Sequence, residues 1–145
     1  MLFQRTRGLG KMIHDYGCYF MCLIWYAALY KLEPFDVESV KGLYDLFIKK
    51  GWMNEKCFIH DPEKILLYLG LNVAFLQEHS PPDRVCAPNE FEILFWEYEG
   101  RRSQQRLWRH FTAGNGNGYL TYDPWPNSIT ANYGGLVSKR IFRFV

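Results

Sequence analysis

The first residue whose type and position could support chemistry is a cysteine at the start of a long apolar stretch. Cys18 follows the turn-like sequence His14-Asp15-Tyr16-Gly17 and precedes a run that stays apolar to Tyr30. At the first position of a helix, unpaired backbone N–H groups and the helix dipole favour a thiolate over a thiol. Cys18 is therefore a candidate nucleophile, provided that the run after it is a helix.

A histidine and an aspartate flank a glycine-rich turn near the other end of the chain. Gly114-Asn115-Gly116-Asn117-Gly118 supplies the positive-φ residues of a tight hairpin, with His110 before it and Asp123 after it. An even loop length places both side chains on one face of the sheet, and a four-residue loop places them directly opposite each other. An odd loop or a bulge would instead pair His110 with Tyr122 or Thr121. The spacing favours a carboxylate that orients an imidazole.

Each of these residues also has an ordinary structural interpretation. A free cysteine is often a small buried residue, and a strand histidine is often part of the core or the surface. An aspartate before Pro124 is common in turns. The combination of Cys18, His110 and Asp123, rather than any one of them, predicts thiol chemistry.

The element that must position Cys18 is a helix predicted from Gly17 to Lys31, which ends before Pro34. Its residues are apolar on nearly every side, so it has to be buried.

An alternative interpretation of this region is a secretory signal. Arg5, Arg7 and Lys11 precede the apolar run, as basic residues precede the core of a signal peptide. The run is shorter than the roughly 20 residues that span a bilayer. His14 and Asp15 interrupt its approach, and no small-x-small cleavage site follows clearly. These features favour the buried helix.

The remaining pattern predicts helices first and strands afterwards. Asp36 caps a second helix that ends at Gly51, and Asp61-Pro62-Glu63 begins a third that ends at Gly70. The predicted strands are Leu71–Gln77, Phe91–Tyr98, Leu107–Ala113, Tyr119–Asp123 and Arg140–Val145. This order predicts an α+β fold, with an N-terminal buried helix and further helices packed on an antiparallel sheet, in one domain over residues 1–145.

Composition limits the possible partners. The chain has 145 residues, 48% of them hydrophobic and 18% aromatic, which excludes a disordered protein. Seventeen Lys and Arg against fifteen Asp and Glu give a formal charge of +2, too balanced to predict binding to nucleic acid or a membrane. Arginines 101, 102, 106 and 109 cluster around two glutamines and are interpreted as a solvated loop between strands.

The four cysteines, Cys18, Cys22, Cys57 and Cys86, are interpreted as free thiols. A protein with this much apolar content does not need disulfides, and Cys18 and Cys22 lie on adjacent turns of the predicted helix. We therefore expect a cytoplasmic protein.

Three short motifs together resemble papain-like cysteine peptidases. They are Gly17-Cys18 at the start of a buried helix, His110-Phe111-Thr112-Ala113-Gly114 before a hairpin, and Tyr122-Asp123-Pro124-Trp125-Pro126 after it. The bacteriocin-processing, double-glycine-type branch is the most similar. The sequence also resembles a family of short uncharacterised proteins from spirochaetes and their mobile elements, in which a Gly-Cys-Tyr-Phe start and an Asp-Pro-Trp motif recur.

The resemblance implies a papain-like fold and a bacterial or phage peptidase or amidase. It implies a thiolate nucleophile at Cys18, a general base and acid at His110, and an Asp123 that holds the imidazole. The substrate would be a peptide or protein, and no cofactor is implied. Trp108 and Trp125 are candidates for the lining of a substrate groove.

The sequence departs from the papain-like pattern at the oxyanion site. That pattern includes a glutamine a few residues before the cysteine, whereas Gln4 is expected to lie too far upstream. His14, when protonated, and the backbone N–H of Cys18 are the candidate donors that remain. Loss of one oxyanion donor commonly lowers turnover by about two to three orders of magnitude.

Three functions from different classes follow. The first is an active thiol peptidase or amidase, and the second is an inactive papain-like scaffold that binds a protein. The third is a metal site formed by His14, Cys18 and Cys22, which recur at four-residue steps. Thiol reactivity separates the first two, and metal analysis tests the third.

Overall fold

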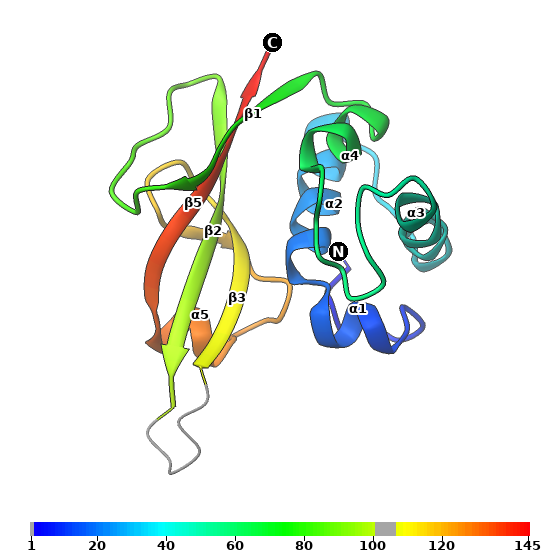
Figure 1. The fold of residues 1–145 in the computed structure, drawn as a ribbon, viewed down its shortest axis with the longest axis horizontal. Coiled ribbons are helices and arrows are strands. Elements are labelled where there is room, and N and C mark those ends of the chain that lie inside the picture. The colour runs from blue at the N-terminus through cyan, green and yellow to red at the C-terminus, as the bar shows by residue number, and fades with distance from the viewer. Residues whose placement is uncertain (1, 101–106) are drawn as a thin grey trace.

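A helical half and a β-sheet half face each other in the computed structural model, which describes residues 2–100 and 107–145 (Figure 1). The described residues run through four helices before the first strand, and a short fifth helix lies between the last two strands. The predicted α+β class with an antiparallel sheet is therefore confirmed.

Helix α2, Cys18–Lys31, is the central helix and lies between the sheet and the other helices (Figure 1). Its buried residues point in all directions around its axis, as its uniformly apolar sequence predicts: they are Phe20, Met21, Cys22, Leu23, Ile24, Tyr26 and Ala27. The run that resembled a signal peptide thus forms the centre of the core.

A short helix that the sequence pattern did not predict, α1 (Lys11–Tyr16), precedes α2. Gly17 joins the two helices and donates its N–H to the Ile13 carbonyl over 2.9 Å. A Cβ at residue 17 would lie 2.5 Å from that oxygen, so the junction requires glycine. Six residues are too few to show a helical period, which explains why the pattern did not indicate α1.

The two predicted capped helices are present. Helix α3, Val37–Lys49, begins after Asp36, whose side chain accepts the Ser39 N–H. Helix α4, Pro62–Tyr68, begins after Asp61, whose side chain accepts the Lys64 N–H. Both caps satisfy backbone donors that a helix start leaves unpaired.

The sheet has the strand order β1-β5-β2-β3-β4, and all described pairs are antiparallel. Its strands are β1 (Val73–Ser80), β2 (Glu90–Glu99), β3 (Leu107–Gly114), β4 (Leu120–Tyr122) and β5 (Gly135–Phe144). The C-terminal strand lies between β1 and β2 and is longer than predicted. Helix α5, Ile129–Tyr133, was not predicted; it packs against β2, β3 and β5.

One face of the sheet packs against α2 through aromatic side chains. The ring of Tyr26 lies 4.5 Å from that of Phe91, and the ring of Tyr19 lies 4.6 Å from that of Phe111. Aromatic pairs at such distances contribute both buried area and favourable ring geometry. These contacts fix the start of α2 against β3, the strand that carries His110.

The β3–β4 hairpin differs in register from the expected one. Ala113 pairs with Tyr122 and Gly114 pairs with Leu120, with an irregularity between the two pairs. Strand β4 ends at Tyr122, so Asp123 lies just beyond it. The direct pairing of His110 with Asp123, which a four-residue loop would give, does not form, whereas β3 and β4 pair antiparallel as predicted.

Two further expectations concern the arginine cluster, interpreted as a solvated loop, and the absence of a membrane-spanning helix. Arg109 lies on β3, 3.8 Å from the Glu97 carboxylate, whereas Arg101, Arg102 and Arg106 lie outside the described residues. Within the described ranges, no helix combines the length and apolar character needed to cross a membrane.

Candidate active site

Cys18 is the first residue of α2 and is partly buried. Gly17 directly before it permits the sharp junction with α1. The N–H groups of a first helical turn have no partner within the helix. The predicted position of the thiol, at a helix N-terminus, is confirmed.

His110 and Asp123 form a short, buried hydrogen bond. His110 Nε2 lies 2.6 Å from Asp123 Oδ1, and the two residues are 7% and 9% exposed. A charge-assisted bond of this kind is among the stronger hydrogen bonds in proteins. The structure thus joins the two residues that the sequence had placed on either side of the glycine-rich turn.

Both oxygens of Asp123 are held by further donors. Oδ1 also accepts the Trp125 N–H over 3.0 Å, and Oδ2 accepts the Ser128 N–H and hydroxyl over 3.1 and 2.7 Å. These bonds fix the rotation of the carboxylate and direct Oδ1 toward the imidazole. Ser128 was not identified from the sequence, although its place as the cap of α5 is a recognisable signal.

His110 also interacts with the Cys18 side chain, which helps to raise the pKa of the imidazole and relates all three residues. Because Nε2 is bonded to Asp123, the other ring nitrogen, Nδ1, is left for the sulfur. Burial lowers the pKa of His110, but the interactions with Asp123 and Cys18 outweigh it and raise the pKa to about 9. The site therefore favours an imidazolium.

The pKa of Asp123 moves the opposite way. Burial raises the pKa of this carboxyl group. The opposing effects are larger: the pKa is lowered by the hydrogen bond to His110, by the positive charge of His110, and by the Ser128 and Trp125 donors, so it lies below its ordinary value. The carboxylate is thus ionised and stabilises a protonated ring.

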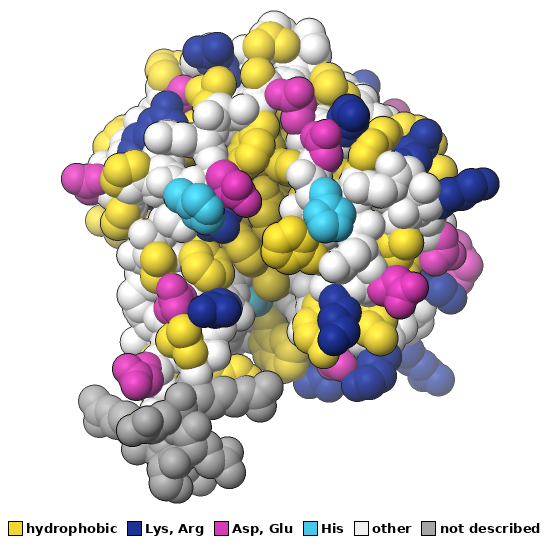
Figure 2. Space-filling view, in the orientation of Figure 1, with side chains coloured by type: hydrophobic (Ala, Val, Ile, Leu, Met, Phe, Trp, Pro, Cys, Tyr) yellow, Lys and Arg dark blue, Asp and Glu magenta, His cyan; other side chains and the backbone are white. Residues whose placement is uncertain are grey.

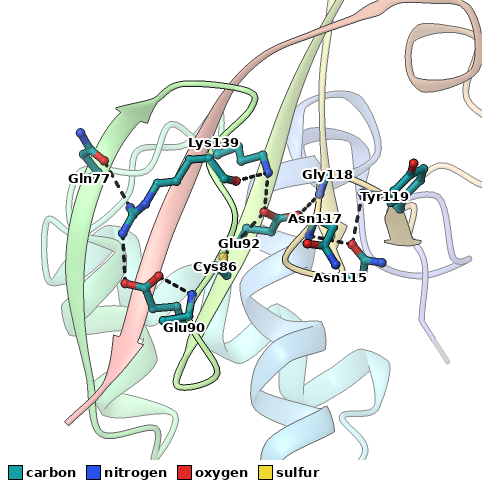
Figure 3. A network of polar contacts seen from close by, with 12 residues as sticks. Gln77, Cys86, Glu90, Glu92, Asn115, Asn117, Gly118, Tyr119 and Lys139 are labelled. Atoms are coloured by element: carbon teal, nitrogen blue, oxygen red, sulfur yellow. Dashed lines mark hydrogen bonds and ion pairs between the residues drawn. The ribbon is translucent and has the colours of Figure 1, made fainter.

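A buried ion pair supports the hairpin that joins these residues (Figure 3). Lys139 Nζ lies 2.9 Å from Glu92 Oε1, and Glu92 Oε2 accepts the Gly118 N–H over 2.8 Å. Gly114 packs so closely on Glu92 that a Cβ there would overlap the carboxylate. The Lys139 ammonium also donates to the Arg84 carbonyl. The network anchors both ends of the glycine-rich turn to β2.

Gln4 lies beside the site, contrary to the expectation that it is too far upstream. Its backbone N–H donates to the Pro124 carbonyl over 2.8 Å, which places it next to Asp123. Its side-chain Nε2 donates to the His14 carbonyl over 2.9 Å, four residues before Cys18. Gln4 is 3% exposed, and its Oε1 is buried without a partner among the described residues. Sequence spacing could not reveal this, because the contact is tertiary.

His14, the predicted oxyanion donor, uses its ring in another contact. Its Nε2 lies 3.1 Å from the Thr6 carbonyl oxygen. The ring therefore helps to hold the N-terminal segment against α1. The side-chain amide of Gln4 is bonded to the backbone carbonyl of the same histidine.

The two tryptophans differ in their relation to the site. Trp125 is bonded to Asp123 through its backbone N–H and is 39% exposed, with the Arg5 guanidinium 4.7 Å from its ring. Trp108 is an exposed residue of β3, two positions before His110. Trp125 thus borders the buried His110–Asp123 pair directly.

The other cysteines are not suited to nucleophilic chemistry. Burial raises the pKa of Cys22 well above its ordinary value, and raises those of Cys57 and Cys86 to about 12. Over the described ranges, no three metal-ligating side chains come together, so the predicted grouping of His14, Cys18 and Cys22 does not form a metal site.

An apolar pocket lies along α2 near the site. It is lined by Leu2, Met21, Ile24, Trp25, Ala28, Pro34, Phe35 and Tyr122. Tyr122 directly precedes Asp123, and the ring of Trp25 stacks on it at 5.2 Å. The pocket borders the segment that carries Asp123 but does not include the three site residues.

Comparison with known proteins identifies a family. The family model described as "Protein of unknown function, DUF261" matches residues 1–144. No curated protein and no solved structure is significantly similar to this protein. The expected resemblance to a family of uncharacterised proteins agrees with this finding, whereas these comparisons do not show a relationship to papain-like peptidases.

Proposed function

The chain belongs to the DUF261 family, and we propose that it is a papain-like cysteine hydrolase that cleaves a peptide or amide bond. One observation carries this proposal: His110 is hydrogen-bonded to Asp123 and interacts with Cys18, whose thiol lies at the start of a helix. Nucleophile, base and orienting carboxylate are the three parts of a thiol hydrolase.

In this mechanism, the Cys18 thiolate attacks the carbonyl carbon and forms a tetrahedral intermediate. The His110 imidazolium then protonates the leaving amine, which leaves an acyl group on the sulfur. A water molecule, deprotonated by the now neutral His110, hydrolyses the thioester, which restores the Cys18 thiolate and the His110 imidazolium. Asp123 stays ionised and keeps Nε2 protonated, so that Nδ1 exchanges the proton with sulfur and substrate.

We propose two donors for the oxyanion. The first is the backbone N–H of Cys18, at the unpaired start of α2. The second is the Gln4 amide, which uses one N–H for the His14 carbonyl and has a second to donate. Preorganised donors of this kind supply a large part of the rate acceleration in acyl transfer.

A scaffold without turnover that binds a protein is the second candidate. It is favoured by the Gln4 side chain, which is already bonded to His14 and buried. If that amide cannot turn toward a substrate, the site lacks one oxyanion donor.

Thiol reactivity tests the proposal. Cys18 should be alkylated by iodoacetamide faster than the other three cysteines near neutral pH, and His110→Ala should slow that reaction. Site-resolved mass spectrometry measures both. Slow labelling of Cys18 that does not depend on His110 would refute the hydrolase and leave the binding scaffold. Incubation with a peptide library, with Cys18→Ser as the control, then identifies cleaved bonds.

We further propose a cytoplasmic location and no requirement for a cofactor. All four cysteines are free thiols in the structure, which suits a reducing compartment.

A further inference from the structure

Arg140 is a buried cation on the face of the sheet that packs against the helices. It lies on β5 and is 7% exposed. Its guanidinium carbon lies 4.9 Å from the ring centres of both Phe95 and Phe111. Cation–π contacts with two aromatic rings hold the guanidinium at this place on the sheet.

The hydrogen-bonding capacity of Arg140 is only partly used. Nη1 donates to the Ser138 hydroxyl over 2.9 Å, whereas Nε is buried without a partner within the described residues. No carboxylate among the described residues lies within ion-pair distance of Arg140; Glu78 acts on it only from farther away. The edge formed by Nε and Nη2 is the edge of a guanidinium that binds a carboxylate side-on through two parallel hydrogen bonds.

The neighbouring residue on β5, Lys139, differs from Arg140 because its buried charge has a counter-charge. Lys139 is equally buried, but it is paired with Glu92 at 2.9 Å and bonded to the Arg84 carbonyl. A buried charge without a counter-charge costs free energy, so proteins normally pair it. The described residues supply a counter-charge at ion-pair distance for Lys139 but not for Arg140, although Arg140 donates to Ser138. A bound anion would supply the missing counter-charge.

Arg140 contacts a ring on β3, the strand that also carries His110. The ring is that of Phe111, which follows His110, and it lies 4.6 Å from the ring of Tyr19, which follows Cys18. Figure 2 shows a hollow between the sheet and the helices, with hydrophobic side chains along its floor.

From these contacts we infer that Arg140 is a specificity residue that binds a carboxylate of the substrate close to the bond that Cys18 attacks. The inference rests on the proposed hydrolase function and adds a substrate class, peptides with an anionic group beside the scissile bond. The carboxylate comes either from an acidic side chain or from the carboxyl terminus of a peptide.

Two alkylating reagents of similar size test the inference on the intact protein. Iodoacetate carries a carboxylate and iodoacetamide does not, so the ratio of their rates at Cys18 reports on a nearby anion site. We expect Arg140→Met to lower this ratio by roughly fivefold, as the loss of one charge at short range predicts. Increasing salt should lower the ratio in the wild type and have less effect in the variant.

Matched variants separate this effect from a general loss of charge or of folding. Arg143→Met removes an exposed cation from the same strand and should leave the ratio unchanged. Arg140→Lys keeps the charge and should retain part of the preference, which provides a test if Arg140→Met does not fold. A ratio equal in the wild type, Arg140→Met and Arg140→Lys overturns the inference while leaving Cys18 a reactive nucleophile. Absence of His110-dependent labelling by either reagent overturns the proposed function itself.

Two small probes identify the source of the carboxylate. N-acetylglutamate α-amide presents only the carboxylate of a side chain, and N-acetylalanine presents only that of a peptide terminus. Protection of Cys18 from iodoacetamide by either probe, lost in Arg140→Met and kept in Arg143→Met, supports the inference and names the source. Protection that is the same in Arg140→Met and the wild type counts against it.

Discussion

His110 and Asp123 are joined by a 2.6 Å hydrogen bond although they are not partners across the hairpin. Ala113 faces Tyr122, so continued pairing would place Thr112, not His110, opposite Asp123. The bond forms because β4 ends at Tyr122 and the Ser128 and Trp125 donors turn the carboxylate toward the ring. The hydrogen bond therefore depends on the loop after β4 as much as on the hairpin.

Replacement of Asp123 tests the role of this bond. Asp123→Ala should lower hydrolase activity by about three to four orders of magnitude, as loss of the orienting carboxylate does in related triads. Asp123→Asn should be milder if its amide oxygen still accepts the Nε2–H. The measurement is turnover of a cleaved peptide, with circular dichroism to verify folding. Equal activity of the wild type and Asp123→Ala would show that the residue only forms a turn.

Much of the fold is predictable from local sequence signals, but the site is only partly so. The caps at Asp36 and Asp61 and the apolar helix after Gly17 depend on neighbouring residues, and the sequence predicts all three correctly. The insertion of β5 between β1 and β2 depends on distant pairing, for which the sequence holds no periodic signal. The same holds for Gln4, which reaches the site only because the N-terminal segment packs against Pro124.

The ionisation of His110 gives a prediction with a defined sign. Its pKa in the folded protein is about 9, above its ordinary value of 6.5, because the interactions with Asp123 and Cys18 outweigh burial. The stability that the protonated ring contributes is therefore fully present below pH 6.5 and is lost as the pH rises through about 9. NMR titration of the His110 ring should give this pKa, and Asp123→Ala should lower it. A wild-type pKa at or below 6.5 would exclude a stable imidazolium.

Two measurements on one variant can distinguish a role of Gln4 in oxyanion binding from an effect on the Cys18 nucleophile. If its amide binds the oxyanion, Gln4→Ala should lower turnover by about a hundredfold or more. Alkylation of Cys18 by iodoacetamide passes through no oxyanion, so its rate should change little. A parallel loss of both rates would mean that Gln4 acts by holding the N-terminal segment in place.

Gly17 should be irreplaceable at the junction before Cys18. A Cβ there would lie 2.5 Å from the Ile13 backbone oxygen, so Gly17→Ala requires the backbone to shift. We expect a loss of about 1–3 kcal/mol in the free energy of unfolding, as overpacking commonly produces. Gly42→Ala is the matched control: it lies within α3 with open space around it, and should be neutral or stabilising by up to about 1 kcal/mol. Urea denaturation measures both, and similar effects of the two substitutions would contradict the prediction.

Glu92 and Lys139 should stabilise the protein as a pair, because either charge alone would be buried without a counter-charge. Lys139→Met leaves the Glu92 carboxylate, which is 0% exposed, without its counter-charge. Removal of one member of a buried pair commonly costs about 3–5 kcal/mol. Adding Glu92→Gln to that variant removes the unpaired charge, while the amide oxygen still accepts the Gly118 N–H. The double variant should therefore recover much of the lost stability in urea denaturation. A double variant no more stable than Lys139→Met would indicate that the packing of the lysine side chain, rather than the charge, holds the hairpin that His110 and Asp123 flank.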